Sequence, residues 1–368
     1  MVQIFYFYVV FHKLNSDYLY EQWSCGAELW RAQVTRFPFL PIGPFFEALS
    51  IYFALIAEAL IPVLLAIRPT RHLGMAFGAW FHFVVSMNPS NLFFNFTSML
   101  FAIFALYAME DFVSIWNRMS RPITQQVAEA IAPVREVFAQ PIVHRALLGI
   151  FGVVILASGD YLLQLSTEDR QAASELVHSI ALPVSLTIWI VYALPLVALF
   201  SLLALEPVSK RPTSAFHLPY KSLLVVPLLT FLNGASPYLG LKTKTTFAMY
   251  SNLVTIDVNY NHLIVPPSFQ IAGYQYDLVE ILDSSAPSLQ RLQRDYLRIT
   301  WFEFVRLTSE VPEASVTYRR AGVEHRVERI GDDPALSRPH PYVLGKILHF
   351  HLSDRRPQST CKRAREFP

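Results

Sequence analysis

Residues 7–18 read Phe7-Tyr8-Val9-Val10-Phe11-His12-Lys13-Leu14-Asn15-Ser16-Asp17-Tyr18. This apolar, aromatic run ends in a lysine. A cation near the centre of a bilayer costs about 2.5 kcal/mol or more, so a lysine at such a place is a candidate functional residue. Two interpretations stay open. Lys13 either extends its amine to the headgroup region, or burial disfavours its ammonium form and the amine acts as a base.

The composition of the whole chain is that of a membrane protein. Of the 368 residues, 53% are hydrophobic and 16% are charged, and the mean hydropathy is +0.34. Soluble domains carry about 25% charged residues. The 28 Phe and 17 Tyr fit a protein with aromatic residues at both membrane interfaces. A formal net charge of +2 gives no reason to expect nucleic acid as a partner, so the bilayer is the expected surrounding.

The sequence predicts neither a metal site nor a disulfide framework. Cys25 and Cys361 are the two cysteines, and their spacing matches no metal or disulfide pattern. The histidines also lack ligand spacing, and residues 1–14 lack the features of a signal peptide. An initial apolar segment this short falls below the roughly 20 residues of a span. A fragment and a misassigned start codon are the two explanations we weigh.

Apolar segments predict a polytopic α-helical membrane protein with about seven membrane segments. They cover residues 2–12, 45–67, 73–87, 92–109, 146–165, 180–205 and 222–239. Basic residues gather in the loops after the second, fourth and sixth segments, namely Arg68, Arg71, Arg118, Arg121, Arg135, Lys210 and Arg211. Positive loops tend to be cytoplasmic. Residues 15–44 and the C-terminal part are therefore predicted on the non-cytoplasmic side.

The sequence after residue 240 differs in character. Residues 1–240 form the predicted transmembrane domain, 241–354 a small extramembrane α+β domain, and 355–368 a disordered tail. Strands are expected at 263–265, 276–282, 314–319 and 323–330, the last two joined by a hairpin at Ala321-Gly322. Residues 288–309 have the pattern of one amphipathic helix.

Five segments place a polar residue near the non-cytoplasmic side of the bundle: Lys13, Glu47, His82, Asp160 and Asn233. Such a layer is what a buried site open to that side would need. Each residue also has a structural interpretation: a headgroup anchor, a helix-start carboxylate, a core histidine, an interfacial residue and a helix break, respectively. Glu58 is deeper, and we expect it to lie outside this layer.

Three stretches together resemble one family. They are residues 5–15 followed by Trp23, then Phe81-His82-Phe83 with Met87-Asn88, and finally 233–242 with 246–253 and Asn261-His262-Leu263. They are similar to the vitamin K-dependent γ-glutamyl carboxylases and their microbial relatives, the horizontally transferred transmembrane (HTTM) domain proteins. The resemblance covers roughly residues 5–265. That family usually has further helices before the lysine segment, and His12 stands where we would expect a small or basic residue.

The resemblance implies a chemistry for the polar layer. In the carboxylases, the lysine matching Lys13 is held to deprotonate a reduced naphthoquinone, a vitamin K-type hydroquinone. Oxygen addition then gives a strongly basic alkoxide, which removes a γ-proton of a glutamate in a peptide, and CO2 traps the carbanion as the quinone leaves as its epoxide. Lys13 and His82 would be catalytic, and Asp160, Asn233 and Glu47 would bind the quinone. A lysine is an efficient general base when its pKa lies near the operating pH, and a low-dielectric pocket would lower the pKa toward that range.

Two functions of different classes follow. The first is a carboxylase-like lyase with quinol epoxidase activity. The second is a non-catalytic membrane component that binds lipid, quinone or a partner protein. A transporter is a third and weaker interpretation, because the sequence has no paired discontinuous helices or inverted halves.

Overall fold

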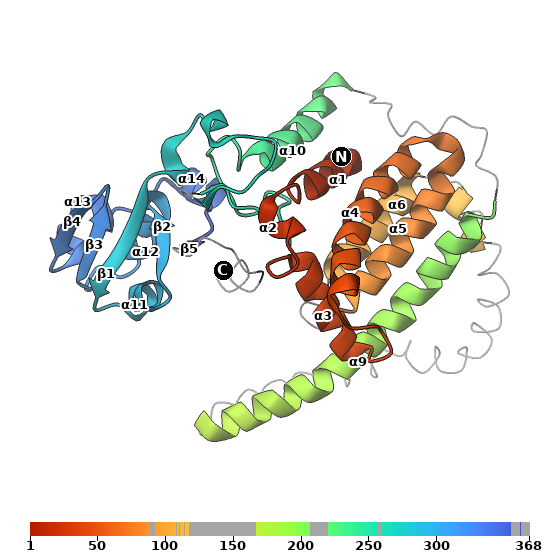
Figure 1. The fold of residues 1–368 in the computed structure, drawn as a ribbon, viewed down its shortest axis with the longest axis horizontal. Coiled ribbons are helices and arrows are strands. Elements are labelled where there is room, and N and C mark those ends of the chain that lie inside the picture. The colour runs from red at the N-terminus through yellow and green to blue at the C-terminus, as the bar shows by residue number, and fades with distance from the viewer. Residues whose placement is uncertain are drawn as a thin grey trace, which may run out of the picture. The chain divides into compact units, whose positions relative to one another are not determined.

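The protein is described here from a computed structural model. The described residues are 1–88, 93–107, 109, 111–113, 115–117, 167–206, 220–256, 259–354 and 361, with 167–182 described by their backbone (Figure 1). The chain divides into two compact units. The first contains Met1–Ala66, Asn88–Asn91 and Ser214–Pro368, and the second contains Ile67–Met87 and Leu92–Thr213.

The helices of the first unit carry the lysine segment. They are α1 (Val2–Phe11), α2 (Ser16–Leu19), α3 (Cys25–Arg36), α4 (Pro44–Ala66), η2 (Lys221–Leu224) and α10 (Val225–Ala235). α1 packs against both α4 and α10 (Figure 1). Local sequence sets the helix starts: the Asn15 side chain accepts from the Tyr18 N–H, and Ser24 accepts from the Gly26 N–H.

α1 and α10 approach closely at a glycine. A Cβ atom built on Gly234 would lie 2.1 Å from the ring of Tyr8, and Tyr8 is itself buried. The ring of Phe231 also faces Tyr8, with centroids 5.4 Å apart. Gly234 is therefore the residue that lets the aromatic face of α1 lie against α10.

The C-terminal part of the first unit is a small antiparallel sheet with helices. The strands are β1 (Leu278–Ser284), β2 (Leu297–Thr300), β3 (Val316–Arg320), β4 (Val323–Val327) and the two-residue β5 (Ser353–Asp354), in the order β4-β3-β1-β2-β5. The helical elements are η4 (Pro267–Phe269), η5 (Gly273–Gln275), α11 (Pro287–Arg294), α12 (Trp301–Ser309), η6 (Ile330–Asp332), α13 (Pro334–Ser337) and α14 (Tyr342–Ile347). Alternate residues of β1, Val279 and Ile281, are buried against Leu289 and Phe304.

Three of the four predicted strands are present, and the hairpin is confirmed. Arg320 pairs with Val323, and Ala321 and Gly322 both have positive φ, as a tight hairpin turn requires. The strand predicted at 263–265 was wrong. The His262 Nδ1 atom accepts the N–H groups of Ile264 and Val265, so these donors close a local turn and do not enter a ladder.

The single helix predicted at 288–309 was also wrong. α11 ends at Arg294, Tyr296 has a φ of 56°, and β2 then pairs with β1 before α12 begins. Leu297 and Ile299 alternate with Arg298, which is the period of a strand. Thr300 then caps α12 by accepting from the Glu303 N–H.

The second unit is helical among its described residues. It contains η1 (Arg68–Thr70), α5 (Arg71–Ser86), α6 (Phe94–Tyr107) and α9 (Thr167–Leu203). The Trp189 indole of α9 donates to the Ser86 hydroxyl of α5 at 2.8 Å, and its ring stacks on Phe94 of α6. Small residues of α5, including Gly74, Gly78 and Ala79, are buried, and α5 packs against both α6 and α9.

Two described helices are long and apolar enough to cross a membrane, Pro44–Ala66 and Pro183–Leu203. A third span results if Phe94–Tyr107 and Asp111–Asn117, bent by 103° to each other, are counted as one. Val2–Phe11 and Lys221–Ala235 are shorter apolar helices. The structure therefore supports a membrane protein but does not confirm seven spans, and the predicted segment 146–165 lies outside the described residues.

Cys25 and Cys361 form a disulfide, with Cα atoms 4.8 Å apart. The spacing of the two cysteines predicted no disulfide framework, and this bond could not be predicted because a separation of 336 residues leaves no pattern in the sequence. The bond packs against Tyr18, Ala27 and Ile51. Of the predicted disordered tail 355–368, Cys361 is the described residue, and it is covalently tied to the start of α3.

Gly234→Ala should destabilise the protein by about 1–3 kcal/mol, because the added methyl group overpacks the contact with Tyr8. Thermal unfolding in detergent measures the effect. Gly345→Ala is the matched control, since no atom lies within 4 Å of a Cβ at that helical position. Equal melting temperatures for the two variants would contradict the assignment of Gly234 as the contact point.

Candidate functional site

Lys13 is buried and paired with a carboxylate. It follows α1 in a turn, and its side chain is 6% exposed. Its Nζ donates to Oε2 of Glu58 on α4, whose side chain is 11% exposed. The ring of Tyr18, from α2, lies 5.5 Å from the amine and provides a cation–π contact. Lys13 is thus held by groups from two other elements.

The position of Glu58 along α4 shows how far the Lys13–Glu58 pair lies from the two ends of that helix. Glu58 comes 14 residues after Pro44 and 8 before Ala66, which at about 1.5 Å per residue is roughly 21 Å and 12 Å from the two helix ends. Glu58 was expected to lie outside the polar layer, yet its carboxylate contacts the Lys13 amine. That expectation used the position of the backbone, whereas a long lysine side chain can reach a carboxylate at a different level.

Pro62 makes the helix irregular at the same point. A proline has no N–H, so the Glu58 carbonyl lacks its usual donor four residues ahead. The carbonyl of Pro62 in turn accepts from the Gln3 side chain of α1 at 3.0 Å. These polar contacts fix the register of α1 against α4.

The backbone next to Lys13 is held by a second set of polar residues, the Asn15 network, consisting of Asn15, Ser251, Asn252, Asn261 and His262. Asn15 is fully buried, and its amide donates to the His12 and Ser251 carbonyls at 2.7 and 2.6 Å. Its oxygen accepts from the Tyr18 N–H at 2.8 Å. The bonds to His12 and Tyr18 are local to the turn that carries Lys13, and the bond to Ser251 joins that turn to a distant segment.

The rest of the network links that turn to residues some 240 positions later. Asn261 donates to the Asn15 side chain and to the Asn252 carbonyl. Asn252 joins the Trp23 carbonyl and the Cys25 N–H. His262 donates from Nε2 to the Phe11 carbonyl at 3.0 Å, and the Leu263 N–H bonds to the Leu14 carbonyl.

His12 also contributes to this link. Its Nδ1 lies 2.8 Å from the Tyr238 hydroxyl and its Nε2 lies 2.9 Å from the Thr246 carbonyl. His12 therefore has a structural role in joining the end of α1 to Tyr238 and Thr246.

The loop that receives these bonds has an unusual backbone. Thr245, Phe247, Tyr250 and Asn252 all have φ between 56° and 66°. Left-handed conformations at non-glycine residues cost about 1–3 kcal/mol each and persist only where the surroundings hold them. Asn233 is one such support, since its amide donates to the Thr245 carbonyl at 2.8 Å.

The five predicted site residues have different surroundings. Lys13 and Asn233 both belong to the region around the Asn15 network. Glu47 lies in the first turn of α4 and pairs with Arg31 at 2.7 Å. His82 is buried in the second unit beside the rings of Phe96 and Phe104. Asp160 lies outside the described residues, and the predicted meeting of Lys13 with His82 stays a prediction.

Glu58 and the Asn15 network were not predicted as parts of the site. A carboxylate inside an apolar helix, four residues before a proline, was the signal for Glu58. The later residues of the network gave a weaker signal, which is that they lie in the stretches 246–253 and 261–263 that resemble the carboxylase family. In the part of the chain that the structure describes, no group of three or more His, Cys, Asp or Glu residues could hold a metal ion.

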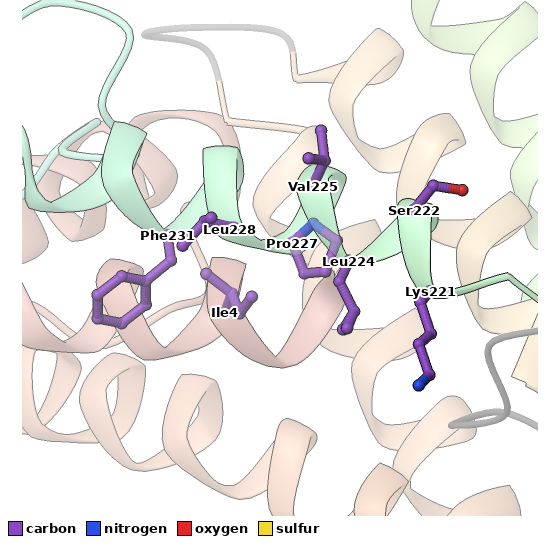
Figure 2. A pocket seen from close by; sticks show the side chains of 8 residues that line it. All are labelled: Ile4, Lys221, Ser222, Leu224, Val225, Pro227, Leu228 and Phe231. Atoms are coloured by element: carbon purple, nitrogen blue, oxygen red, sulfur yellow. The ribbon is translucent and has the colours of Figure 1, made fainter.

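An apolar groove of about 540 Å³ lies beside α1, the helix that precedes Lys13. It is lined by Ile4 of α1 and by Leu224, Val225, Pro227, Leu228 and Phe231, with Lys221 and Ser222 at one end (Figure 2). Lys13 is not among the lining residues.

The chain matches no family model, and no curated protein or solved structure is similar to it. The resemblance to the carboxylases therefore depends on the sequence stretches named above.

Asn15→Ala should lower the stability of the protein by about 2–3 kcal/mol, because it leaves buried donors and acceptors without partners. Thermal unfolding measures the loss. Ser16→Ala is the control, since the Ser16 hydroxyl makes an exposed contact with Asp17. If both variants melt like the parent protein, the Asn15 network does not hold the lysine turn.

Acid should also weaken this network. Burial lowers the pKa of His262 below 6.5, opposed in part by the Nε2 bond to Phe11. The unfolded chain therefore takes up a proton as the pH falls through 6.5 while the folded histidine stays neutral, so stability is complete above that pH and decreases below it.

The melting temperature should fall between pH 7 and pH 5, and His262→Gln should reduce this slope. Burial also lowers the pKa of His351, to about 4, which adds a slope of the same sign. A flat melting profile in the parent protein, or an unchanged slope in His262→Gln, would contradict this role.

Proposed function

We propose that the chain is a membrane enzyme related to the γ-glutamyl carboxylases and HTTM proteins, in which Lys13 deprotonates a reduced naphthoquinone. The observation that carries the proposal is the burial of the Lys13 amine in an apolar helical region. A simple headgroup anchor would keep its ammonium in contact with the interface. The coupling of residues 11–15 to residues 246–263 supports it too, because both stretches resemble the same family.

The residues around Lys13 fit the task of a positioned base. A general base must be held within hydrogen-bond reach of the proton that it takes. The Asn15 network fixes the turn, and Tyr18 and Glu58 restrict the conformations of the Lys13 side chain. The quinol hydroxyl would lose its proton to the Lys13 nitrogen, and the oxygen would keep the electron pair. Oxygenation, CO2 and a glutamate-containing peptide would complete the reaction, with His82 as a stabilising partner.

Lys13→Arg is the sharpest test of this proposal. Arginine keeps the positive charge opposite Glu58 but is not deprotonated in proteins. The variant should therefore fold while epoxide formation falls to background when purified protein receives reduced naphthoquinone and oxygen. Mass spectrometry of the quinone product measures the effect. Lys221→Arg, at the end of the groove, is the control and should keep the parent rate.

The ion pair with Glu58 also favours a second candidate, a non-catalytic membrane component. A charge pair that is satisfied within the protein can be purely structural. Parent protein that makes no epoxide under these conditions, or Lys13→Arg that makes it at the parent rate, would favour this second function.

We also propose that residues 15–44 and the C-terminal part face the non-cytoplasmic side. The disulfide between Cys25 and Cys361 supports this orientation, because such bonds persist in oxidising compartments. It agrees with the distribution of basic residues in the loops.

Cys25→Ser tests the orientation because it leaves Cys361 as the sole cysteine of the chain. A membrane-impermeant maleimide should label this variant in intact spheroplasts, and it should label the parent protein only after reduction. The double variant Cys25→Ser/Cys361→Ser is the blank. Labelling that requires opened cells would place the tail on the cytoplasmic side.

A further inference from the structure

We propose that Glu58 is the positioning residue and counter-ion of the Lys13 base. This inference rests on the proposed function and extends it to a residue that the family resemblance does not name. Its starting point is that both side chains are buried and bonded to each other although they come from different helical regions, the turn after α1 and the interior of α4.

Glu58 determines where the amine lies. A lysine side chain has four rotatable bonds and, near the end of a membrane helix, extends readily toward the headgroups. The Asn15 network holds the backbone of the turn, and the hydrogen bonds described for Asn15 do not involve the amine. Of the contacts described for that amine, the carboxylate of Glu58 is the charged one and the ring of Tyr18 is the other. Removal of Glu58 would free the amine to leave the site.

Glu58 also stabilises the product of the proton transfer. When the neutral amine takes a proton from a substrate hydroxyl, the O–H bond breaks, an N–H bond forms, and an ammonium and an oxyanion appear in apolar surroundings. A carboxylate next to the amine lowers the cost of the ammonium, as the buried aspartate does for the imidazolium of a serine protease triad. Tyr18 is the other titratable group that faces the amine.

The construction of α4 keeps the carboxylate in place. Glu58 lies one turn before Pro62, and the contact between Gln3 and the Pro62 carbonyl fixes α1 at that level. Glu313 forms an exposed ion pair with Arg329 in the C-terminal part of the chain. Because exposed pairs contribute little, Glu313→Gln offers a control for the loss of a paired carboxylate.

The first experiment measures quinol epoxidation by Glu58→Gln, Glu58→Asp and Glu313→Gln in nanodiscs. Glu58→Gln should reduce kcat by about 100-fold or more with little change in KM, since a base contributes about 100- to 10,000-fold. Glu58→Asp should recover part of this loss, and Glu313→Gln should keep the parent rate. A melting temperature for each variant separates lost activity from lost fold. A folded Glu58→Gln variant with the parent kcat would overturn the proposal.

The second experiment does not depend on turnover. A membrane-permeant N-hydroxysuccinimide ester acylates neutral amines, and mass spectrometry reports the extent at Lys13 across pH 6–10. Loss of the carboxylate disfavours the ammonium, so Glu58→Gln should be labelled at lower pH than the parent protein. Lys221 is the internal reference. Identical Lys13 profiles in both proteins would overturn the pairing, and absence of epoxide from the parent protein would refute the proposed function by itself.

Discussion

An amine buried inside an apolar protein needs a counter-charge for its protonated form and a rigid backbone, and the rest of this structure depends on how Lys13 obtains them. Glu58 supplies the charge from the middle of α4. The rigid backbone comes from Asn15, whose amide group is fully used within and beyond the lysine turn. Packing alone does not require the Lys13–Glu58 pair or the Asn15 hydrogen bonds. Leucines in place of Lys13 and Glu58 would fill the same space without the cost of burying charge.

The region that holds Lys13 is also the most strained part of the described chain. Four non-glycine residues between 245 and 252 adopt positive φ. Strain of this kind is kept where it positions something else. Here the loop presents the Ser251 carbonyl to Asn15 and the Thr246 carbonyl to His12. The cost of the loop conformation therefore supports the geometry around the lysine.

Much of the helical fold could be predicted from hydropathy, and α1, α4 and α5 begin and end within a few residues of the predicted segments. The hairpin at Ala321-Gly322 could be predicted because its turn chemistry is local. β2 was missed because four residues give a short signal beside two helices. The disulfide and the Asn15 network could not be predicted, since pairing over hundreds of residues leaves no periodic pattern.

The candidate site was predicted in part. Lys13 stood out because ionisable residues are rare in apolar segments, and Asn233 has a supporting role that the sequence left open. Glu58 was misjudged, because a sequence gives the depth of a Cα and not the reach of a side chain. Asn88 was named only within a stretch that resembles the carboxylase family, and its amide donates to the Leu29 carbonyl of α3.

The long separation between Asn15 and Asn261, 246 residues, has a consequence for biosynthesis. At about 5–20 residues per second, a ribosome would release the lysine turn roughly 12–50 s before the strained loop emerges to meet it. Glu58 follows Lys13 after only 45 residues. Glu58 would therefore be available to the nascent Lys13 within seconds. The segment 245–262, which holds the backbone of the lysine turn, would be synthesised only late in translation.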